Sequence, residues 1–401
     1  MENLLEEAKR YYNQKLNQKL PAFKRYIFDD ILKSPAKLTA IYGSRGVGKT
    51  TLLMQVLKLY KIRKSQMLYV SCDYPYMQGV SLYEFVEYFS QRGGKVIFVD
   101  EVHEARNFEQ ELKMVYDMLD IKVYFTGSSA ISLKNPDLAR RYSMYHLAHF
   151  SFREFISLKY KIKLMSYTLE DILKNHENIV YDLFEKLPNK KILQDFEEFL
   201  FFGTYPFYFE DKSRYIDRIN DTIEKILHID LSKIYSISPD KIDVLKKLLV
   251  TVCVSEPFEF TMDKLSSKVG ITKATLYKYL IYLDKAELIR LISHEAKRYA
   301  NIRKSDKIYL ANTNLSNAIC INKLKGTLRE TYFVSMLYPG HKLNYAEKGD
   351  FLVDEKYTFE IGGKNKGFKQ IADIPNSYVA ADDIEVGFEN KVPLWLFGFL
   401  Y

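Results

Sequence analysis

The period of hydrophobic and polar positions changes along the chain and divides it into parts. Between residues 37 and 150, short apolar runs alternate with segments whose apolar residues recur at helical spacing. This alternation is typical of a parallel sheet with helices between its strands. We therefore expect an α/β domain with a doubly wound parallel sheet over residues 1–150, beginning with an amphipathic helical lead-in over residues 1–36.

Helical periodicity replaces the strand signals between residues 151 and 240. Apolar residues at helical spacing mark the segments 169–174, 192–201 and 215–227. This pattern predicts a group of helices that would act as a lid on the sheet domain.

The pattern changes again over residues 241–315, where short helices precede two apolar strands. The predicted elements are helices over residues 262–269 and 273–283 and strands over residues 288–292 and 307–310. Gly270 ends the first helix, and Thr272 caps the second. The apolar face of the second helix carries Leu276, Leu280 and Leu283. This order predicts a winged helix-turn-helix, with the two strands as its wing.

The last part, residues 325–401, combines a helix with strands and predicts a small α+β domain. Two strands joined by a tight hairpin would bring Asp350 and Glu360 near each other, with Lys364 close by. Residues 393–401 are apolar enough to form a closing strand of this domain's sheet.

A glycine-rich loop joins the strand of residues 37–42 to the helix of residues 51–59. The loop and the residue after it read Gly43-Ser44-Arg45-Gly46-Val47-Gly48-Lys49-Thr50-Thr51, which contains the pattern G-x-x-x-x-G-K-[ST]. Main-chain N–H groups of such a loop surround the α- and β-phosphates of a nucleotide. Lys49 would contact the β- and γ-phosphates, and Thr50 would bind Mg²⁺. We therefore expect the chain to bind a nucleoside triphosphate with magnesium.

Two carboxylates, Asp100 and Glu101, follow the apolar strand of residues 95–99. In a P-loop enzyme, carboxylates at this position hold the magnesium and polarise the attacking water. We expect Asp100 to bind Mg²⁺ through water and Glu101 to act as the catalytic base, which favours hydrolysis over binding alone.

Small hydroxyl side chains follow the next apolar strand, residues 122–125. In a parallel sheet, Thr126 and Ser128 would emerge at the edge that carries the phosphate loop and the acidic pair. Either hydroxyl is a candidate for contact with the γ-phosphate. Ordinary turn chemistry explains the sequence Thr-Gly-Ser-Ser almost as well.

The run from Leu133 to Phe155 resembles the corresponding stretch of a large group of prokaryotic AAA+ superfamily ATPases. The matching segments are Asp137-Leu-Ala-Arg140-Arg141-Tyr, Tyr145-His-Leu147 and Phe150-Ser-Phe-Arg-Glu-Phe155. The resemblance covers nearly the whole chain and implies a P-loop ATPase that uses ATP. It also implies a winged helix after the ATPase and a C-terminal domain similar to restriction-endonuclease-like nucleases.

By similarity to the family's Leu-Ala-Gly-Arg pattern, Arg141 matches the arginine that approaches a neighbouring nucleotide. Arg140 stands where the family often has glycine, so the finger is either Arg140 or Arg141. An arginine that acts on a neighbouring subunit requires a homo-oligomer. The alternative is that both arginines pair with surface carboxylates.

The same resemblance gives Asp350, Glu360 and Lys364 a role in metal-dependent cleavage. In restriction-endonuclease-like folds, two carboxylates hold Mg²⁺ and a lysine positions water. The active pattern is Glu-x-Lys, with both side chains on one strand face, whereas Glu360-Ile-Gly-Gly-Lys364 inserts two residues. We expect an inactive, structural or binding version of this fold, with an ATP-gated nuclease as the alternative.

Positive charge is concentrated in the predicted winged helix. The chain has a formal net charge of +8 at pH 7, and residues 261–305 hold ten Lys or Arg against four acids. A basic helix-turn-helix is the expected footprint for contacts with DNA phosphates. The candidate contacts are Lys273, Thr275, Lys278, Tyr282, Lys297 and Arg298. Winged helices also bind proteins, so the alternative is a slow nucleotide-controlled switch with a protein partner.

No apolar stretch approaches the length of a membrane span, and the N-terminus has no apolar signal core. We therefore expect a cytoplasmic protein with no membrane partner. Cys72, Cys253 and Cys320 lie in apolar surroundings without metal-ligand spacing. We expect reduced, buried thiols rather than a zinc site or a disulfide.

Overall fold

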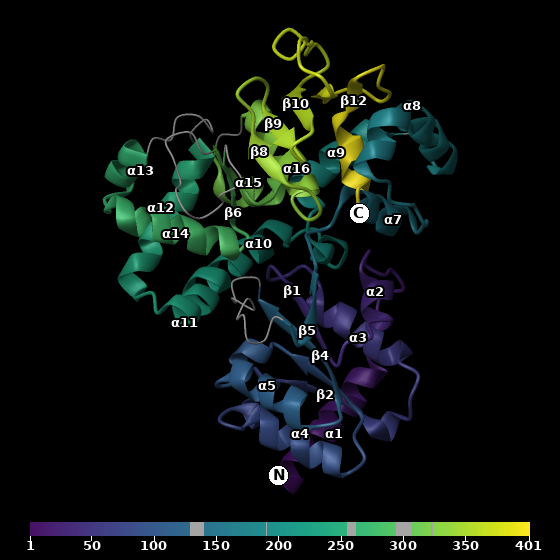
Figure 1. Cartoon of the computed structure of the whole chain (residues 1–401), viewed down its shortest axis with the longest axis vertical. Coiled ribbons are helices and arrows are strands. Elements are labelled where there is room, and N and C mark those ends of the chain that lie inside the picture. Colours follow the sequence, from purple (N-terminus) through teal and green to yellow (C-terminus); the bar gives the residue numbers. More distant parts are fainter. Residues whose placement is uncertain (129–139, 190, 255–261, 294–306, 322–323) are drawn as a thin grey trace. The chain divides into compact units, whose positions relative to one another are not determined.

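The structure is a computed structural model of residues 1–401 and describes all of them except 129–139, 190, 255–261, 294–306 and 322–323. The described chain divides into two compact units, Met1–Ala148 and His149–Tyr401 (Figure 1). The first unit corresponds to the α/β domain expected over residues 1–150. The three later parts lie in the second unit, and their separation from one another stays a prediction.

The strands of the first unit form a parallel sheet with the order β2-β3-β4-β1-β5. These strands are β1 (Leu38–Gly43), β2 (Met67–Ser71), β3 (Val96–Asp100), β4 (Lys122–Ser128) and β5 (Tyr142–His146). The helices are α1 (Glu2–Asn17), α2 (Phe28–Leu32), α3 (Lys49–Leu59), α4 (Leu82–Gln91) and α5 (Phe108–Met118), with a short 3₁₀-helix η3 (Val102–Glu104) after β3. The predicted α/β fold with a parallel sheet is confirmed.

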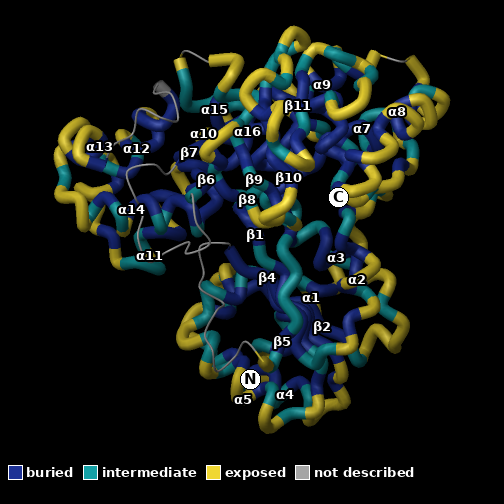
Figure 2. Tube along the Cα trace, turned by 45° about the horizontal axis from the view of Figure 1, so that its top comes forward, coloured by how far each residue is buried: buried dark blue, intermediate teal, exposed yellow. Residues whose placement is uncertain are grey.

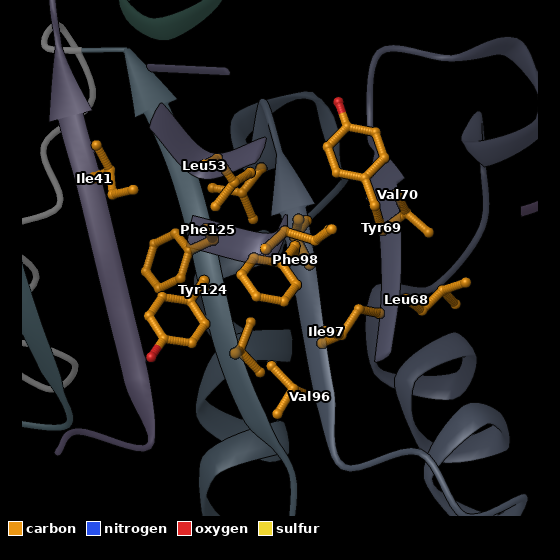
Figure 3. Packing of buried hydrophobic residues seen from close by; sticks show 14 of the residues in the cluster. Ile41, Leu53, Leu68, Tyr69, Val70, Val96, Ile97, Phe98, Tyr124 and Phe125 are labelled. Atoms are coloured by element: carbon orange, nitrogen blue, oxygen red, sulfur yellow. The ribbon is translucent and has the colours of Figure 1, made fainter. Parts of the chain in front are cut away.

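The central strands of this sheet are buried on both faces. Every residue of β2 and β3 is buried (Figure 2), which explains why these strands read as continuous apolar runs rather than as alternating patterns. Figure 3 shows aromatic and branched side chains of the sheet and of α3 that belong to this buried core, among them Leu53 and Phe125. The rings of Phe98 and Tyr124 stack with centroids 5.0 Å apart.

The strand register brings the predicted chemical groups to one edge of the sheet. Gly43, at the end of β1, pairs with Ser128 of β4. Val99 of β3 pairs with Phe125 of β4, so Asp100 and Thr126 are the next residues along these strands. The carboxyl ends of parallel strands form the usual ligand crevice of an open α/β sheet.

The second unit begins with a helical region. Its helices are α7 (Phe152–Tyr160), α8 (Leu169–Lys186), α9 (Ile192–Phe202), α10 (Tyr215–Lys225), α11 (Ser232–Tyr235) and α12 (Pro239–Val254), and a π-helical segment, Ile226–Leu231, joins α10 to α11. The helices predicted as a lid pack within this unit: α7 and α8 contact the C-terminal 3₁₀-helix η6 (Leu394–Phe399). The Phe152 ring meets Trp395 and Phe399 edge-on. These helices therefore share a core with the end of the chain.

The elements predicted for a winged helix are present. They are α13 (Met262–Val269), α14 (Lys273–Lys285) and the antiparallel strands β6 (Ile289–Ile292) and β7 (Lys307–Leu310). The Thr272 hydroxyl accepts a hydrogen bond from the Thr275 N–H at 3.2 Å and caps α14, as predicted. The leucines at positions 276, 280 and 283 are buried, which confirms the predicted apolar face.

The C-terminal sheet has the order β12-β11-β10-β9-β8. Its strands are β8 (Leu343–Tyr345), β9 (Phe351–Val353), β10 (Tyr357–Gly362), β11 (Ser377–Ala381) and β12 (Lys391–Pro393), with the helices α15 (Thr313–Ile319) and α16 (Lys325–Leu337) before them. The pairs β8–β9 and β9–β10 are antiparallel, whereas β10–β11 and β11–β12 are parallel. This mixed sheet agrees with the predicted α+β character.

The closing strand predicted over residues 393–401 is wrong. The strand β12 ends at Pro393, and Leu394–Phe399 forms η6. Every residue of η6 is buried, so its apolar run has no polar face from which a period could be read. A short run that is apolar at every position does not distinguish a strand from a buried helix.

The prediction of free thiols is wrong for two of the three cysteines. Cys253 and Cys320 form a disulfide with Cα atoms 5.3 Å apart. Cys72 is a buried free thiol, as expected. Local apolar surroundings predicted the burial of Cys72 and Cys253, but they could not show that Cys253 and Cys320, 67 positions apart, would meet.

Within the part of the chain that the structure describes, no helix combines the length and the apolar character needed to cross a bilayer.

Candidate nucleotide-binding site

The phosphate loop connects the end of β1 to the start of α3 and depends on its glycines. Gly46 and Gly48 have φ angles of 84° and 97°, in the left-handed region that favours glycine. Gly43 lies against the main chain, because a Cβ there would be 2.3 Å from the Leu147 carbonyl oxygen. The three glycines therefore shape a tight loop that side chains would obstruct.

The Lys49 side chain is buried inside this loop. Its Nζ donates hydrogen bonds to the carbonyl oxygens of Gly43 and Ser44, both at 2.9 Å. Among the described residues, no carboxylate forms an ion pair with Lys49, and the buried Ser44 Oγ has no hydrogen-bond partner. A buried cation surrounded by neutral acceptors is electrostatically incomplete. The loop therefore fits an anion such as the phosphates of a nucleotide.

The other loop residues surround the start of α3. Val47 is buried, and Arg45 is half-buried. Thr50 and Thr51 are half-buried in the first turn of α3. The N–H groups of a first helical turn have no partners within the helix, so this end of α3 can donate to an anion.

Asp100 is almost fully buried at the end of β3, and hydroxyl groups on the two neighbouring strands hold its carboxylate. Tyr69 of β2 donates to Oδ2 at 3.0 Å. Thr126 of β4 donates to Oδ1. Burial raises the pKa of Tyr69, and Asp100 raises it further, so this hydroxyl stays protonated as a donor. These two hydrogen bonds fix the orientation of the Asp100 carboxylate, which is what a magnesium ligand requires.

Thr126 also positions Glu101. The Glu101 N–H donates to the Thr126 Oγ1 at 2.9 Å, and Glu101 adopts a left-handed conformation with φ of 49°. Its side chain remains partly exposed, and its Oε2 lies 3.4 Å from the His103 Nδ1. Thr126 is therefore bonded to the acidic pair, and the γ-phosphate contact of Ser128 or Thr126 stays a prediction.

We expect Thr126→Val to disturb the acidic pair while preserving the shape of the side chain. The change removes the hydrogen bonds to Asp100 and to the Glu101 N–H, so it should destabilise the fold by roughly 1–3 kcal/mol in urea unfolding. It should also weaken the Mg²⁺ dependence of nucleotide binding, measured by titration. Thr39→Val is the matched control, because Thr39 is a buried threonine of β1 whose hydroxyl contacts Ser34. Equal effects of the two substitutions on Mg²⁺ dependence would contradict the assignment.

The structure places Arg141 in a pair with a carboxylate of its own unit. Its Nε and Nη2 lie 3.2 and 3.3 Å from the two carboxylate oxygens of Asp117 on α5. Arg140 is exposed. In this structure Arg141 pairs with a surface carboxylate. The assignment of Arg140 or Arg141 as an arginine finger stays a prediction.

The carboxylates of the C-terminal sheet approach each other as predicted, but the lysine is a different one. The Asp350 Oδ2 accepts from the Ile361 N–H at 2.7 Å, next to Glu360 on β10. Glu360 is buried and pairs with Lys366, whereas Lys364 is exposed and its carbonyl oxygen accepts a hydrogen bond from the Lys391 Nζ. The structure therefore pairs Glu360 with Lys366 and not with Lys364, and the part of Lys364 in a vestigial nuclease site stays a prediction.

Two further residues join this carboxylate cluster. The fully buried Lys307 of β7 places its Nζ 3.6 Å from the Asp350 Oδ1 and 3.8 Å from Glu330 of α16. Burial raises the pKa of both Glu330 and Glu360. The described residues contain no group of three or more His, Cys, Asp or Glu side chains arranged to hold a metal ion. Lysines thus neutralise these carboxylates.

The structure describes four of the six residues predicted to contact DNA. Lys278 is exposed, and Lys273 is exposed in a pair with Asp263. Thr275 donates its N–H to the cap of α14. The Tyr282 ring stacks on Tyr235 of α11 with centroids 3.7 Å apart, and its contact with DNA stays a prediction. Lys297 and Arg298 lie outside the described residues.

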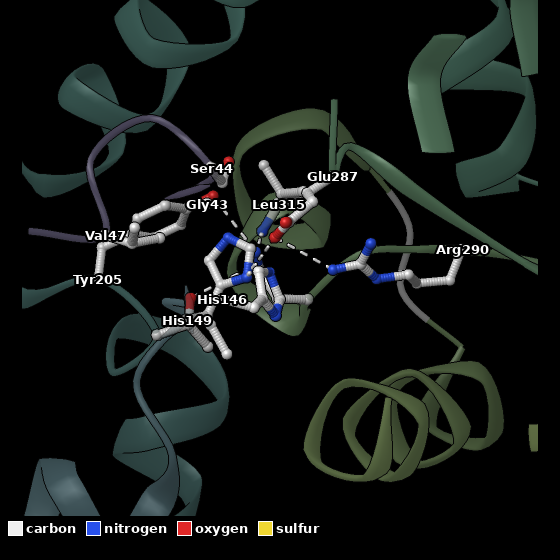
Figure 4. Close-up of polar contacts among 12 residues, drawn as sticks. Gly43, Ser44, Val47, His146, His149, Tyr205, Glu287, Arg290 and Leu315 are labelled. Carbon is white, nitrogen blue, oxygen red and sulfur yellow. Dashed lines mark hydrogen bonds and ion pairs between the residues drawn. The ribbon is translucent and has the colours of Figure 1, made fainter. Parts of the chain in front are cut away.

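One arginine counted in the basic segment is buried. Arg290 donates from Nη2 to the Glu287 Oε2 at 3.2 Å, and its guanidinium lies 3.9 Å from the centre of the Tyr338 ring. Figure 4 shows Glu287 between Arg290 and His149, whose Nδ1 is 3.9 Å from the same carboxylate. Arg290 therefore contributes to the core of the second unit and not to a surface for DNA.

Sequence reasoning missed the residues that reach the site from neighbouring strands and loops. Tyr69 lies beside Asp100 because β2 and β3 are neighbouring strands. The sequence signal that could have indicated this role is the tyrosine hydroxyl within the apolar run 67–71. Lys307, which belongs to the carboxylate cluster of the C-terminal sheet and not to the nucleotide site, stands at the start of an apolar strand, where burial of a charged residue is unusual. Both signals became informative only once strand order was known.

The comparisons with known proteins agree with this geometry. Residues 35–156 match the family described as AAA domain, and residues 193–326 match a domain of unknown function, DUF8612. An uncharacterized protein of Methanocaldococcus jannaschii is 28% identical over 416 residues, covering 96% of this chain and 86% of that protein.

Two solved structures show weaker similarity. The Walker-type ATPase of Pyrococcus abyssi has a TM-score of 0.42 and 15% identity, covering 76% of this chain and 99% of that one. AMPPCP-bound DnaA from Aquifex aeolicus has a TM-score of 0.28 and 15% identity, covering 68% of this chain and 90% of that one. Residues 35–156, which include the phosphate loop and the parallel sheet, are thus similar to the AAA domain family.

Proposed function

We propose that this chain is a magnesium-dependent ATPase. The observation that carries the proposal is the buried Lys49 ammonium, whose partners among the described residues are main-chain carbonyls, at the sheet edge that also holds Asp100 and Glu101. A triphosphate would supply the missing negative charge. Bound Mg²⁺ would be held by Thr50 and Asp100 and would neutralise charge on the phosphates.

Each residue of the site has a different role in hydrolysis. Lys49 leaves the carbonyls of Gly43 and Ser44 and contacts phosphate oxygens, and Ser128 lies beside the loop in register with Gly43. Glu101 accepts a proton from the attacking water. Such catalysis depends on positioning and charge stabilisation more than on covalent chemistry.

The proposal is tested by measuring nucleotide binding and turnover on the full chain. Calorimetric titration with Mg-ATP should give saturable binding, and phosphate release should require Mg²⁺. GTP in place of ATP tests the choice of base. Absence of heat and of phosphate release under all these conditions would refute the ATPase.

We further propose that the second unit contains a winged helix that binds DNA and couples to nucleotide state. Support comes from the order of α13, α14, β6 and β7 and from the exposed Lys278 on the second helix. Phosphate release measured with and without duplex DNA tests the coupling.

We expect DNA to remain intact after incubation with Mg²⁺ and ATP. The carboxylates of the C-terminal sheet already form ion pairs with Lys307 and Lys366.

Lys278→Ala is expected to weaken DNA binding to a similar degree for all sequences, because a lysine that contacts phosphate carries no base specificity. The slope of log K against log salt should become less steep by about 1, reflecting one lost phosphate contact. Fluorescence anisotropy over a range of salt concentrations measures both effects. Lys186→Ala on α8 is the control, since Lys186 is also exposed and lies outside the predicted winged helix. Identical slopes for the parent chain and both variants would show that Lys278 does not contact DNA.

A nucleotide-controlled switch with a protein partner is the second candidate. The buried Arg290 favours it, because its pairing with Glu287 reduces the basic surface available to DNA. In that case DNA changes neither turnover nor electrophoretic mobility at low salt, while nucleotide binding persists.

A further inference from the structure

A buried arginine outside every recognised motif joins the phosphate loop to the end of the first unit. Arg25, which precedes α2, is 7% exposed. Its Nη1 donates to the Val47 carbonyl oxygen at 2.6 Å, and its Nη2 donates to the Ala148 carbonyl oxygen at 2.6 Å. Val47 belongs to the phosphate loop, and Ala148 is the last residue of the unit. One planar guanidinium therefore holds both segments.

The neighbouring Tyr26 strengthens the same connection. Its hydroxyl donates to the His146 carbonyl oxygen at 2.7 Å and accepts from the Ala148 N–H at 3.2 Å. The Leu147 N–H donates to the Tyr42 carbonyl oxygen at 2.8 Å. Residues 146–148 are thus fastened both to β1, immediately before the phosphate loop, and to the consecutive side chains Arg25 and Tyr26.

We propose that Arg25 is a positioning residue that makes the main chain at Ala148 respond to occupancy of the phosphate loop. This inference rests on the proposed nucleotide binding. For phosphate to enter, Lys49 must exchange its bonds to the Gly43 and Ser44 carbonyls for bonds to phosphate oxygens. That exchange releases main-chain groups of the loop to which Val47 belongs.

The guanidinium transmits this change because its donors are held in a rigid plane. When the Val47 carbonyl shifts, the Arg25 guanidinium that donates to it rotates. The same guanidinium donates to the Ala148 carbonyl, so that hydrogen bond changes as well. One peptide bond after Ala148 the second unit begins, at His149. The state of the nucleotide site is therefore sensed where the chain leaves the first unit.

Hydrogen exchange of the Leu147 and Ala148 amides provides the readout, since both N–H groups donate hydrogen bonds in the structure. Exchange is measured on the full chain with and without Mg-AMPPCP, alongside calorimetric titration of the same nucleotide. In the parent chain, the exchange rates of these amides should change on binding. In Arg25→Gln, the nucleotide should still bind, and the change should be lost.

Gln55→Ala is the matched control. Gln55 is also 7% exposed, and its Nε2 donates to the carbonyl oxygens of Pro21 and Phe23 at 2.8 Å. The control thus removes two partly buried hydrogen bonds to the same lead-in segment but none to the phosphate loop. The nucleotide-dependent change at Leu147 and Ala148 should persist in this variant.

If Arg25→Gln does not fold, Arg25→Lys replaces it in the test. The lysine ammonium keeps the positive charge but lacks the planar arrangement of donors that the guanidinium has. A full nucleotide response in a folded Arg25 variant, or a parent chain that binds nucleotide without any response at these amides, would overturn the inference. Loss of the response in Gln55→Ala as well would also overturn it, because the effect would then be a general loss of packing. A parent chain that does not bind nucleotide would overturn the ATPase proposal too, and the calorimetric titration identifies that outcome.

Discussion

Lys49→Ala is expected to weaken Mg-ATP binding by roughly tenfold to a hundredfold, because a hydrogen bond to a charged group contributes roughly 1.5–3 kcal/mol. Turnover at saturating nucleotide should fall by roughly 10²–10³-fold, since the same ammonium stabilises charge that develops on the transferred phosphoryl group. Calorimetric titration and phosphate release measure the two effects separately. The Lys49 ammonium lies inside the loop already, so nucleotide binding requires only an exchange of its partners.

Lys58→Ala is the control for this substitution. Lys58 lies in the last turn of the same helix, is exposed, and contacts the Gln18 carbonyl. Removing it deletes an equal charge from α3 without touching the phosphate loop. Equal nucleotide affinity in Lys49→Ala and Lys58→Ala would show that the loop does not bind phosphate in the proposed way.

The phosphate loop and the acidic pair could be predicted because each is encoded within a few consecutive residues. Gly46, Gly48 and Lys49 act through the local turn that they form, and the apolar runs on either side identify its context. Asp100 is recognisable for the same reason, as the residue at which a buried strand ends. Such features depend little on the rest of the fold.

The residues that orient these groups depend on which strands become neighbours. Tyr69 and Thr126 reach Asp100 from opposite sides because β3 lies between β2 and β4. Strand order is set by packing of the whole sheet, and no local pattern specifies it. Arg25 is a stronger example, since its partners Val47 and Ala148 are 22 and 123 positions away.

The second unit shows where local reasoning fails for a physical reason. Lys364 and Lys366 both follow β10 closely, and the shape of the turn decides that Lys366 reaches Glu360. Arg290 adds to a charge count in the sequence, but the fold buries it against Glu287. A sequence reports which charges exist, whereas the fold decides which of them face solvent.

The geometry around Glu101 favours a role for its carboxylate in chemistry rather than in folding. The main-chain N–H of Glu101 is already bonded to Thr126, so the left-handed conformation does not depend on the carboxylate. The side chain stays partly exposed beside the buried Asp100. A non-glycine residue with positive φ at a site edge is a form of strain that often accompanies function.

Glu101→Gln is therefore expected to lower kcat by roughly 10²–10⁴-fold, the usual contribution of a general base. Affinity for Mg-ATP should be unchanged, because the amide keeps the shape of the side chain and the Thr126 bond to the main chain. Single-turnover phosphate release and calorimetric titration make the comparison. Glu104→Gln is the control, since Glu104 contacts the other nitrogen of His103, 3.6 Å from its Oε1. If both substitutions lowered kcat equally, the effect would belong to the surroundings of His103, and Glu101 would not be the base.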